Sequence, residues 1–273
     1  MPDLALYADK IDELDRRLTR LPGAIVAFSG GVDSTMLLHA CSRVLGGRVF
    51  AVTADSPSLP RAELDEAIGL ARTMSVEHRI ITTRERDRPE YRANGSDRCY
   101  FCKSELFETI AGEIREQCDV DWPVLYGAIA DDFSDHRPGA RAAAENGVLA
   151  PLADCALTKV EVRCYSREHG LATADKPSFA CLASRVPYGT TVTPEVLAKL
   201  ERSEQVLREL GYRQFRVRHH ETVARIELLP EDFMRAVSVD RDKIAEGIRA
   251  AGYTYVSLDL NGYRTGSMNE VLT

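Results

Sequence analysis

The octet Phe28-Ser29-Gly30-Gly31-Val32-Asp33-Ser34-Thr35 joins an apolar, strand-like run at residues 24–28 to a helix-like run at residues 36–45. Two adjacent glycines allow a tight turn that brings several backbone N–H groups close to an anion. The three hydroxyl side chains add donors at the N-terminus of a helix, where the helix dipole favours negative charge. The octet therefore predicts a cradle for the pyrophosphate part of a nucleotide.

The octet lacks a feature that is common in nucleotide-binding loops. It contains no lysine, and the chain has no G-x-x-x-x-G-K-[ST] pattern in which a loop lysine would neutralise a γ-phosphate. The pattern Ser-Gly-Gly-x-Asp-Ser resembles instead the PP-loop of the ATP pyrophosphatases. That resemblance implies an enzyme that cuts ATP between the α and β phosphates, adenylylates an acceptor and releases pyrophosphate. The alternative is a plain strand-to-helix turn with an N-capping Asp or Ser. All six residues occur together, which favours the nucleotide loop.

The length, net charge and hydropathy of the chain limit the kinds of molecule that it is expected to bind. The chain has 273 residues, enough for one large α/β domain or for two domains. Its net charge of −7 argues against a large nucleic-acid footprint and favours a small-molecule substrate. No run approaches the roughly 20 apolar residues of a membrane span, and the first residues do not resemble a signal peptide. We therefore expect a cytoplasmic protein with no membrane partner and no stably bound nucleic acid.

Apolar, strand-like runs alternate with amphipathic, helix-like runs in the first two thirds of the chain. The expected strands are 24–28, 48–53, 78–82 and 124–127, and the expected helices are 4–21, 36–45, 61–74, 103–117 and 158–169. This alternation predicts an α/β fold with a Rossmann-like parallel sheet covered by helices on both faces. Ligands of such a sheet bind at the C-terminal ends of its strands.

The pattern changes after about residue 187. The expected elements there are a helix at 194–210, an antiparallel strand pair at 215–219 and 223–228, a helix at 230–251 and a strand at 253–260. They predict a smaller α+β domain. We therefore expect a PP-loop domain at residues 1–186 and the α+β domain at residues 187–273, with the loop at 181–189 lining the cleft between them.

Polar residues follow two of the predicted strands. The candidate ATP contacts at the end of the second strand are Thr53, Asp55 and Ser56. An α/β nucleotide fold contacts adenine or ribose at that point, although a simple Asp-Ser-Pro turn accounts for these residues about as well. Gly127 ends the fourth strand and precedes the paired carboxylates of Asp131 and Asp132. Because Mg²⁺ prefers oxygen ligands, Asp132 or its neighbour is the candidate to hold a metal-bound pyrophosphate; a solvated turn is the alternative.

Three of the seven cysteines form a possible metal site. Cys99 and Cys102 form a C-x-x-C pair just before a predicted helix, and Cys181 lies far along the chain. An odd number of cysteines argues against a disulfide framework. The pair could be a redox pair or two incidental thiols. Three thiols leave a zinc site incomplete, but they suit a 4Fe–4S cluster whose fourth iron can bind an exogenous sulfide.

From about residue 14 to the C-terminus, the chain resembles the LarE family of ATP-dependent sulfur transferases. The motifs that carry this resemblance are the loop at 29–34, Thr53-Ala54-Asp55-Ser56-Pro57, Arg98-Cys99-Tyr100-Phe101-Cys102-Lys103, Ala130-Asp131-Asp132 with Arg137-Pro138-Gly139, Lys176-Pro177 through Cys181-Leu182-Ala183-Ser184-Arg185 to Pro187-Tyr188-Gly189, Phe215-Arg216-Val217-Arg218-His219-His220, Ala224-Arg225-Ile226-Glu227, and Asp259-Leu260 with Gly262-Tyr263-Arg264-Thr265-Gly266-Ser267-Met268-Asn269. Their order and joint presence make chance agreement improbable.

The resemblance implies a two-step reaction that needs ATP and Mg²⁺. The enzyme would adenylylate a carboxylate of pyridinium-3,5-biscarboxylic acid mononucleotide and then replace AMP with sulfur, giving a thiocarboxylate in the biosynthesis of a nickel-pincer cofactor. The smaller domain would take part in substrate binding and sulfur transfer. In one version of the family the cysteine matching Cys181 gives up its own sulfur and becomes dehydroalanine; in the other, a 4Fe–4S cluster on Cys99, Cys102 and Cys181 carries the sulfide. This chain has all three cysteines, which favours the cluster.

The remaining candidates lie close to Cys181 or in the smaller domain. Arg185 is the second catalytic candidate, because it should approach the adenylate beside Cys181. Alternation along a strand puts Arg216 and Arg218 on one face, where both guanidinium groups can bind a substrate phosphate; a solvated pair is the alternative. The resemblance also marks three carboxylates as tentative ligands of a divalent cation, although simple solvent-facing side chains are nearly as good an interpretation: Glu201, Glu227 and Asp259.

Two competing functions stay open at this point. One is a PP-loop tRNA thiolase, since some of these enzymes also carry a C-x-x-C pair, a distant cysteine and a cluster. The acidic net charge and the lack of a recognisable RNA-binding extension count against it. The other is a nonenzymatic ATP-binding regulator, which would have no use for Cys181 or Arg185. For the favoured sulfur transferase we also expect a homo-oligomer.

Overall fold

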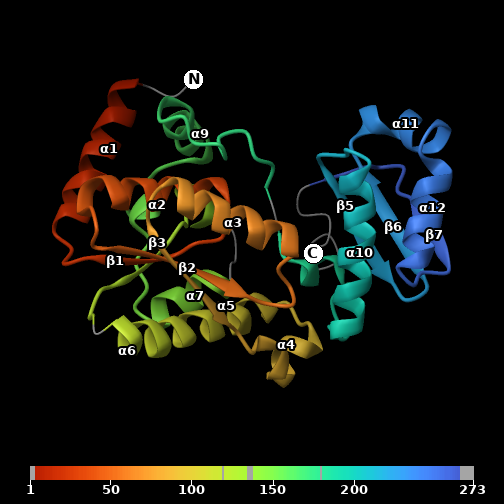
Figure 1. The fold of residues 1–273 in the computed structure, drawn as a ribbon, viewed down its shortest axis with the longest axis horizontal. Coiled ribbons are helices and arrows are strands. Elements are labelled where there is room, and N and C mark those ends of the chain that lie inside the picture. Colours follow the sequence, from red (N-terminus) through yellow and green to blue (C-terminus); the bar gives the residue numbers. More distant parts are fainter. Residues whose placement is uncertain (1–3, 119, 134–137, 179, 265–273) are drawn as a thin grey trace. The chain divides into compact units, whose positions relative to one another are not determined.

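The computed structural model describes residues 4–118, 120–133, 138–178 and 180–264 (Figure 1). Arg137 and the last part of the motif that begins at Gly262 lie outside these residues. The chain forms two compact units, Met1–Glu85 with Cys99–Ser178, and Arg86–Arg98 with Phe179–Thr273. The domain boundary expected between residues 186 and 187 stays a prediction.

The first unit contains the predicted parallel sheet. Its strands are β1 (Ala24–Ala27), β2 (Val49–Asp55), β3 (Glu77–Thr82) and β4 (Val124–Tyr126), in the spatial order β3-β2-β1-β4. The chain therefore steps from β1 to β2 and β3 on one side, and returns to the other side of β1 as β4. In such a sheet a crevice opens at the C-terminal ends of the strands where the order reverses. The loops that follow β1 and β4 meet at this point.

Helices cover both faces of this sheet, as the alternation predicts (Figure 1). The helices of the first unit are α1 (Leu4–Thr19), α2 (Val32–Leu45), α3 (Arg61–Thr73), α5 (Arg98–Thr109), α6 (Arg115–Cys118), α7 (Pro138–Glu145), α8 (Pro151–Asp154) and α9 (Lys159–Glu168). Side chains along β1 alternate between two cores: Ala24 and Val26 belong to one with α1, α2 and α9, and Ile25 belongs to the other with α5 and α7. Both faces of the sheet are therefore buried, and the open part of the sheet is its strand ends.

The helix expected at 103–117 is longer and less regular than the sequence indicates. It begins at Arg98 as α5 and changes to a π-helical turn at Ile110–Ile114 before α6. Ile110 and Ile114 are both buried on the same side of the sheet. The wider π turn is the local adjustment that accompanies their packing.

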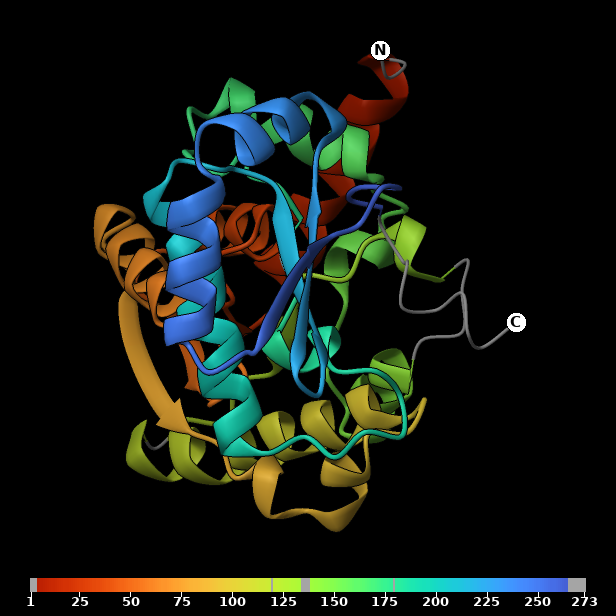
Figure 2. The same ribbon diagram turned by 90° about the vertical axis from the view of Figure 1, so that its right-hand side faces the viewer.

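The second unit is the expected smaller α+β unit. Strand β5 (Phe215–His220) pairs antiparallel with β6 (Val223–Leu228), and β7 (Tyr255–Leu258) pairs parallel with β6. Figure 2 shows these strands side by side with helices along them. The helices are α4 (Pro89–Ala93), α10 (Pro194–Glu209), α11 (Phe233–Ser238) and α12 (Arg241–Ala250). Helix α10 packs on both β5 and α12.

The single helix expected at 230–251 is wrong. A short 3₁₀ turn at Pro230–Asp232 precedes α11, and the chain breaks again before α12. Asp240 lies at the second break, where its carboxylate accepts a hydrogen bond from the Tyr212 hydroxyl at 3.0 Å and pairs with Arg235 at 2.9 Å. These tertiary contacts stabilise the break, and periodicity along the chain does not reveal them. No helix among the described residues is long and apolar enough to cross a membrane.

Candidate functional site

The loop after β1 has the backbone conformation that its glycines predict. Gly30 has φ +68°, in the left-handed region that favours glycine. A Cβ built on Gly30 would lie 3.1 Å from the Cβ of Ala67 and 3.2 Å from its Cα, so α3 packs directly against the loop. Gly30 is therefore required both by its φ and by the space around it.

The hydroxyl groups of the loop form a local network at the start of α2. The Ser34 hydroxyl donates to the Gly31 carbonyl at 3.1 Å, and the Ser29 and Ser34 hydroxyls lie 3.1 Å apart. The N-cap residue of α2 is Gly31, so no side chain caps the first N–H groups of the helix. These N–H groups and the positive end of the helix dipole form an arrangement that binds anions. The pyrophosphate cradle that the octet predicts therefore has a suitable geometry.

The end of β4 lies against the same helix start. A Cβ on Gly127 would lie 2.8 Å from the Ser34 backbone nitrogen and 3.0 Å from the Asp33 carbonyl carbon. Both are backbone atoms, which cannot move aside as a flexible side chain can. Gly127 therefore allows β4 to pass close to the cradle, and the structure brings the predicted Gly127 and Asp33 together.

The predicted ATP contacts at the end of β2 have partners within the protein. The buried Thr53 hydroxyl donates to the Phe28 carbonyl at 2.7 Å and lies 2.8 Å from His78 Nε2, and burial lowers the pKa of that histidine. Asp55 pairs with Arg61, and the Ser56 hydroxyl donates to the buried carboxylate of Glu85. Thr53 thus links β2 to the loop after β1. Contact of these residues with ATP stays a prediction.

Two lysines that the sequence analysis missed approach the loop. Lys159, at the start of α9, pairs with both carboxylate oxygens of Asp33 at 2.7 and 2.6 Å. Lys176 donates to the Gly30 carbonyl at 3.1 Å and pairs with Glu63 on α3 at 2.8 Å. The only sequence signal for Lys159 is the capping pattern of Thr158 and Glu161, which marks a helix start but not its neighbours.

The paired aspartates follow β4 in a 3₁₀ turn at Ala130–Phe133. The Asp131 carboxylate accepts the backbone N–H of Lys159 at 2.7 Å, and the Asp132 carboxylate accepts that of Ile129 at 3.1 Å. Burial raises the pKa of Asp33, the Lys159 ammonium opposes this shift, and Asp132 raises that pKa further. The two carboxylates of Asp33 and Asp132 therefore interact at the loop, and their oxygen atoms suit a hard cation such as Mg²⁺.

The loop that carries Cys181 lies in the second unit. Cys181 is half-buried and is the N-cap of a 3₁₀ turn at Leu182–Arg185, and its carbonyl accepts hydrogen bonds from the Ser184 N–H and hydroxyl. Arg185 is fully buried and donates to the carbonyls of Ala180 and Cys181, the latter at 2.9 Å. Arg185 also makes a bidentate ion pair with Glu204, at 2.9 and 3.1 Å. It thus holds the backbone at Cys181, and direct contact of Arg185 with a reacting group stays a prediction.

A second set of contacts holds the far end of this loop. Asn94 is fully buried at φ 56°, and its side-chain nitrogen lies 2.8 Å from the Pro187 carbonyl and 3.0 Å from that of Thr190. Arg98 donates to the Ala183 carbonyl at 2.8 Å. Residues 86–98 therefore belong to the support of the Cys181 loop, although they are far from it in sequence.

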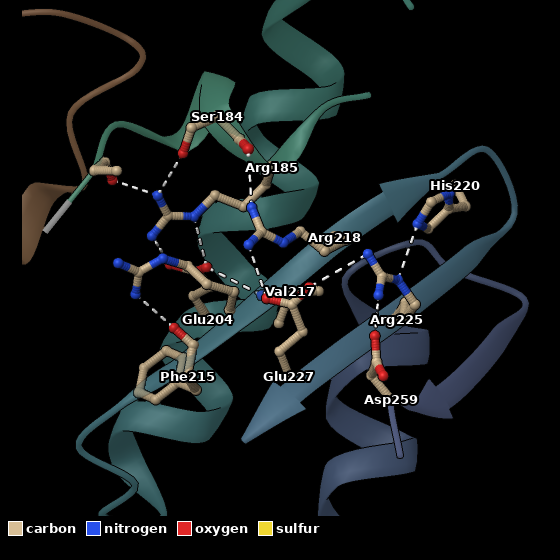
Figure 3. Close-up of polar contacts among 12 residues, drawn as sticks. Ser184, Arg185, Glu204, Phe215, Val217, Arg218, His220, Arg225, Glu227 and Asp259 are labelled. Atoms are coloured by element: carbon tan, nitrogen blue, oxygen red, sulfur yellow. Dashed lines mark hydrogen bonds and ion pairs between the residues drawn. The ribbon is translucent and has the colours of Figure 1, made fainter. Parts of the chain in front are cut away.

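Arg216 and Arg218 share a face of β5, as the alternation predicts. The Arg218 side chain pairs with Glu227 at 2.8 Å and donates to the Ser184 carbonyl at 3.0 Å (Figure 3). Arg216 lies over the ring of Tyr263, 5.1 Å from its centroid. Burial, and then repulsion from Arg185, lowers the pKa of Arg216. A bound anion would offset this repulsion between guanidinium groups. Phosphate binding by Arg216 and Arg218 stays a prediction.

No known family model matches the chain. It is 42% identical over 269 residues to an uncharacterized protein of Synechocystis, covering 98% of this chain and 100% of that protein. It is 35% identical over 271 residues to the pyridinium-3,5-bisthiocarboxylic acid mononucleotide synthase of Lactiplantibacillus plantarum, covering 99% of this chain and 97% of the synthase. The chain belongs to the LarE-like family of PP-loop ATP pyrophosphatases. The family implies ATP binding at the loop after β1.

A more distant relative matches less of the protein. One component of the glutamine-hydrolysing GMP synthase of Thermoplasma acidophilum is 28% identical over 199 residues, which cover 68% of this chain and 63% of that component. The full-length likeness to the synthase of L. plantarum is therefore the more informative comparison.

The cysteines of this LarE-like protein differ in accessibility. All seven lie among the described residues, and none forms a disulfide. Cys41 is buried, and burial raises the pKa of its thiol to about 12, whereas Cys99 is exposed and Cys102 and Cys181 are half-buried. Cys99 and Cys102 belong to the first unit and Cys181 to the second. These three thiols are therefore more accessible than Cys41, and the 4Fe–4S cluster stays a prediction.

Two of the carboxylates expected to bind a divalent cation, Glu227 and Asp259, contact the same arginine. Arg225 pairs with Glu227 at 3.3 Å and with Asp259, and its Nε donates a hydrogen bond to His220 Nε2 at 3.2 Å (Figure 3). Glu201 lies half-buried on α10. Within either unit, the described residues contain no group of three or more His, Cys, Asp or Glu side chains arranged to hold a metal ion. The cation between Glu227 and Asp259 is here a guanidinium, and their role as metal ligands stays a prediction.

Proposed function

We propose that this LarE-like protein is an ATP-dependent sulfur transferase acting on pyridinium-3,5-biscarboxylic acid mononucleotide. The observation that carries the proposal is its similarity to the synthase of L. plantarum over 97% of that protein. That relative is named for a product, a pyridinium mononucleotide with two thiocarboxylate groups. The substrate from which sulfur transfer would form this product has carboxylates in place of the thiocarboxylates. Nickel-pincer cofactor biosynthesis is the corresponding pathway.

The first half-reaction belongs to the PP-loop unit. A substrate carboxylate oxygen attacks the α-phosphorus of ATP, the bond from this phosphorus to the bridging oxygen of the β-phosphate breaks, and pyrophosphate leaves. The uncapped N–H groups of α2 would hold the departing pyrophosphate. Bound Mg²⁺ would neutralise phosphate charge, with Asp132 as its candidate ligand. The acyl adenylate then carries a carbonyl carbon that a sulfur nucleophile can attack.

The second half-reaction needs the Cys181 loop. Attack by sulfur forms a C–S bond and breaks the C–O bond to AMP, which leaves. In the sacrificial route Cys181 then loses its Cβ–Sγ bond and an α-proton and becomes dehydroalanine. In the route that we favour, a 4Fe–4S cluster on Cys99, Cys102 and Cys181 would supply an exogenous sulfide. The half-buried position of Cys181 and the carbonyl contacts from Arg185 are compatible with either route.

The substrate also carries a phosphate, for which Arg216 and Arg218 are the proposed ligands. Their guanidinium groups lie on one face of β5, and burial, together with repulsion from Arg185 and Arg218, disfavours the charged form of Arg216. A phosphate would relieve that repulsion, and arginine can bind it through two hydrogen bonds. The partner would thus be a small mononucleotide.

The test is mass spectrometry of small-molecule products after anaerobic incubation with ATP, Mg²⁺, sulfide and the biscarboxylic mononucleotide. A thiocarboxylate formed together with AMP supports the proposal. ATP consumption without sulfur in the product contradicts it, and thiolated nucleosides formed from added tRNA would favour a tRNA thiolase. The mass of Cys181 after turnover separates the two routes, because only the sacrificial route converts it to dehydroalanine.

A further inference from the structure

We infer that the first unit has a second ligand site, for a planar nucleobase-type ring, at the end of α2 that is remote from the nucleotide loop. The loop after β1 leads into the N-terminus of α2, whereas the second site lies at the C-terminus of this helix. The 14 residues of α2 span about 20 Å, so the two sites are separate. The inference does not rest on the proposed function.

The second site is an open cavity of about 580 Å³ where α2, α3 and α9 end. This volume falls within the range of small-molecule sites in proteins. Leu70, Met74 and Leu171 supply apolar surface on which a ring can pack. His39 and His169 line the same cavity and supply polar ring edges. An apolar wall with a few polar groups is the combination that typically binds a small organic ligand.

Tyr165, which is fully buried on α9, orients both histidine rings. Its hydroxyl lies 2.9 Å from His39 Nδ1, and its backbone carbonyl lies 3.0 Å from His169 Nδ1. The ring of Tyr165 also stacks on that of His169, with the centroids 4.0 Å apart. Tyr165 does not line the cavity, so both Nδ1 atoms are turned away from it. The described residues offer no hydrogen-bond partner to either Nε2, which leaves both of these atoms for a ligand.

The hydrogen bonds to Tyr165 also determine which ring nitrogens carry a proton. A carbonyl only accepts, so His169 Nδ1 donates to it, and the Nε2 of the neutral ring is an acceptor. The Tyr165 hydroxyl accepts a hydrogen bond from Arg43, and its own proton therefore goes to His39 Nδ1. His39 then carries its proton on Nε2, and burial lowers the pKa of His39, which favours this neutral ring. The cavity thus offers one N–H donor and one acceptor nitrogen, on rings whose centroids are 5.0 Å apart.

A nucleobase with an amino group complements this donor and acceptor. Cytosine and adenine each carry an amino donor next to a ring nitrogen that accepts. The amino group can donate to His169 Nε2 while His39 Nε2 donates to the ring nitrogen. Arg43 also lines the cavity, but its guanidinium is engaged with Asp15 and Tyr165, which balances its charge within the protein. The inferred ligand group is therefore the base and not a phosphate.

The test is an NMR titration with cytosine of the purified protein, labelled with ¹⁵N in its six histidines. We expect the ring signals of His39 and His169 to move together, with a Kd of about 1 mM, which suits so small a ligand. His78 contacts Thr53 at the predicted ATP contacts, so its signal reports on the nucleotide site and should not move with the other two.

Two changes test the hydrogen bonds themselves. N4,N4-dimethylcytosine keeps the ring but has no amino hydrogen, and it should bind about fivefold more weakly, the loss of one hydrogen bond. His169→Phe keeps a ring to stack on Tyr165 but removes the acceptor, and it should weaken cytosine binding by a similar factor, measured through the His39 signal. His220→Phe is the matched control, because His220 lies in the second unit, and it should leave cytosine binding unchanged.

Three results would overturn the inference. Cytosine could move neither the His39 nor the His169 signal, or the His78 signal alone. N4,N4-dimethylcytosine could bind as tightly as cytosine, which would mean that the amino group makes no hydrogen bond. His169→Phe could bind cytosine with the affinity of the wild type. These measurements need neither ATP nor an acceptor substrate, so a failure of sulfur transfer would leave their outcome unaffected.

Discussion

At the scale of single residues, two glycines account for the shape of the nucleotide loop. Gly30 provides a left-handed φ and room for α3, and Gly127 lets the end of β4 pass the backbone of Ser34. The sequence predicts Gly30 directly, because two adjacent glycines between a strand and a helix are typical of a tight, anion-binding turn. Gly127 is predicted only from its place at a strand end. The need for it arises from a backbone contact that no local pattern encodes.

Gly127→Ala should damage the nucleotide site. Its Cβ would lie 2.8 Å from the backbone nitrogen of Ser34, so either β4 or the start of α2 must move. We expect the free energy of unfolding to fall by about 1–3 kcal/mol and the affinity for ATP to fall with it, measured by urea denaturation and calorimetry.

Gly69→Ala is the matched control for that change. Gly69 lies within α3, and its Cβ would meet no atom within 4 Å. Alanine should stabilise this helix by about 0.5–1 kcal/mol and leave ATP binding unaltered. Equal effects of the two substitutions would contradict the importance of the contact at Gly127.

At the scale of elements, the regular strands and helices were predictable and their exceptions were not. All four strands of the first sheet follow from apolar runs of suitable length. The break before α12 depends on the contacts of Asp240 with Tyr212 and Arg235. The Lys159 contact with Asp33 depends on the strand order that puts β4 beside β1. Such tertiary contacts have no signature in local periodicity.

The loop that carries Cys181 depends on α4 and the residues that follow it. Asn94→Ala removes the side chain that contacts the Pro187 and Thr190 carbonyls. These part-buried carbonyls would lose a hydrogen-bond donor, at a cost of about 0.5–1.5 kcal/mol. We expect sulfur transfer to fall while ATP-dependent pyrophosphate release is retained, because the pyrophosphate loop belongs to the first unit.

Asn94→Gly separates the carboxamide from the backbone conformation of this residue. Glycine accepts the φ of 56° but offers no hydrogen bond. Sulfur transfer by this variant should be as low as that of the alanine variant. Wild-type sulfur transfer in Asn94→Gly, or equal loss of both half-reactions in either variant, would contradict a role of the carboxamide in positioning Cys181.

At the scale of the whole molecule, the family assignment covers both units. Which segments of the chain belong to each unit could not be predicted from the sequence. The segment at residues 86–98 belongs with the second unit although it follows β3 in the chain. This segment belongs to the second unit because Asn94 and Arg98, which are themselves buried, contact the Cys181 loop. Polar side chains are ordinarily exposed, so the sequence alone would place both of them on a surface.

Stability should fall in mild acid because buried or half-buried histidines lie in both units. Burial lowers the pKa of His39, His78 and His219 below the usual value of 6.5. The folded state therefore binds fewer protons than the unfolded state once the pH falls below 6.5, so protonation favours unfolding. We expect urea denaturation to give a lower free energy of unfolding at about pH 5.5 than at about pH 7.5. His78→Gln should reduce this difference; an unchanged or larger difference would contradict the assignment.

The central claim is that ATP activates a substrate carboxylate, which sulfur then attacks. It is tested most directly with a biscarboxylic mononucleotide carrying ¹⁸O in its carboxylates, incubated with ATP, Mg²⁺ and sulfide under anaerobic conditions. Mass spectrometry should find one ¹⁸O in AMP for each thiocarboxylate formed, because the C–O bond to AMP breaks when sulfur attacks. AMP without ¹⁸O, or ¹⁸O-labelled AMP with no sulfur in the mononucleotide, would contradict the account.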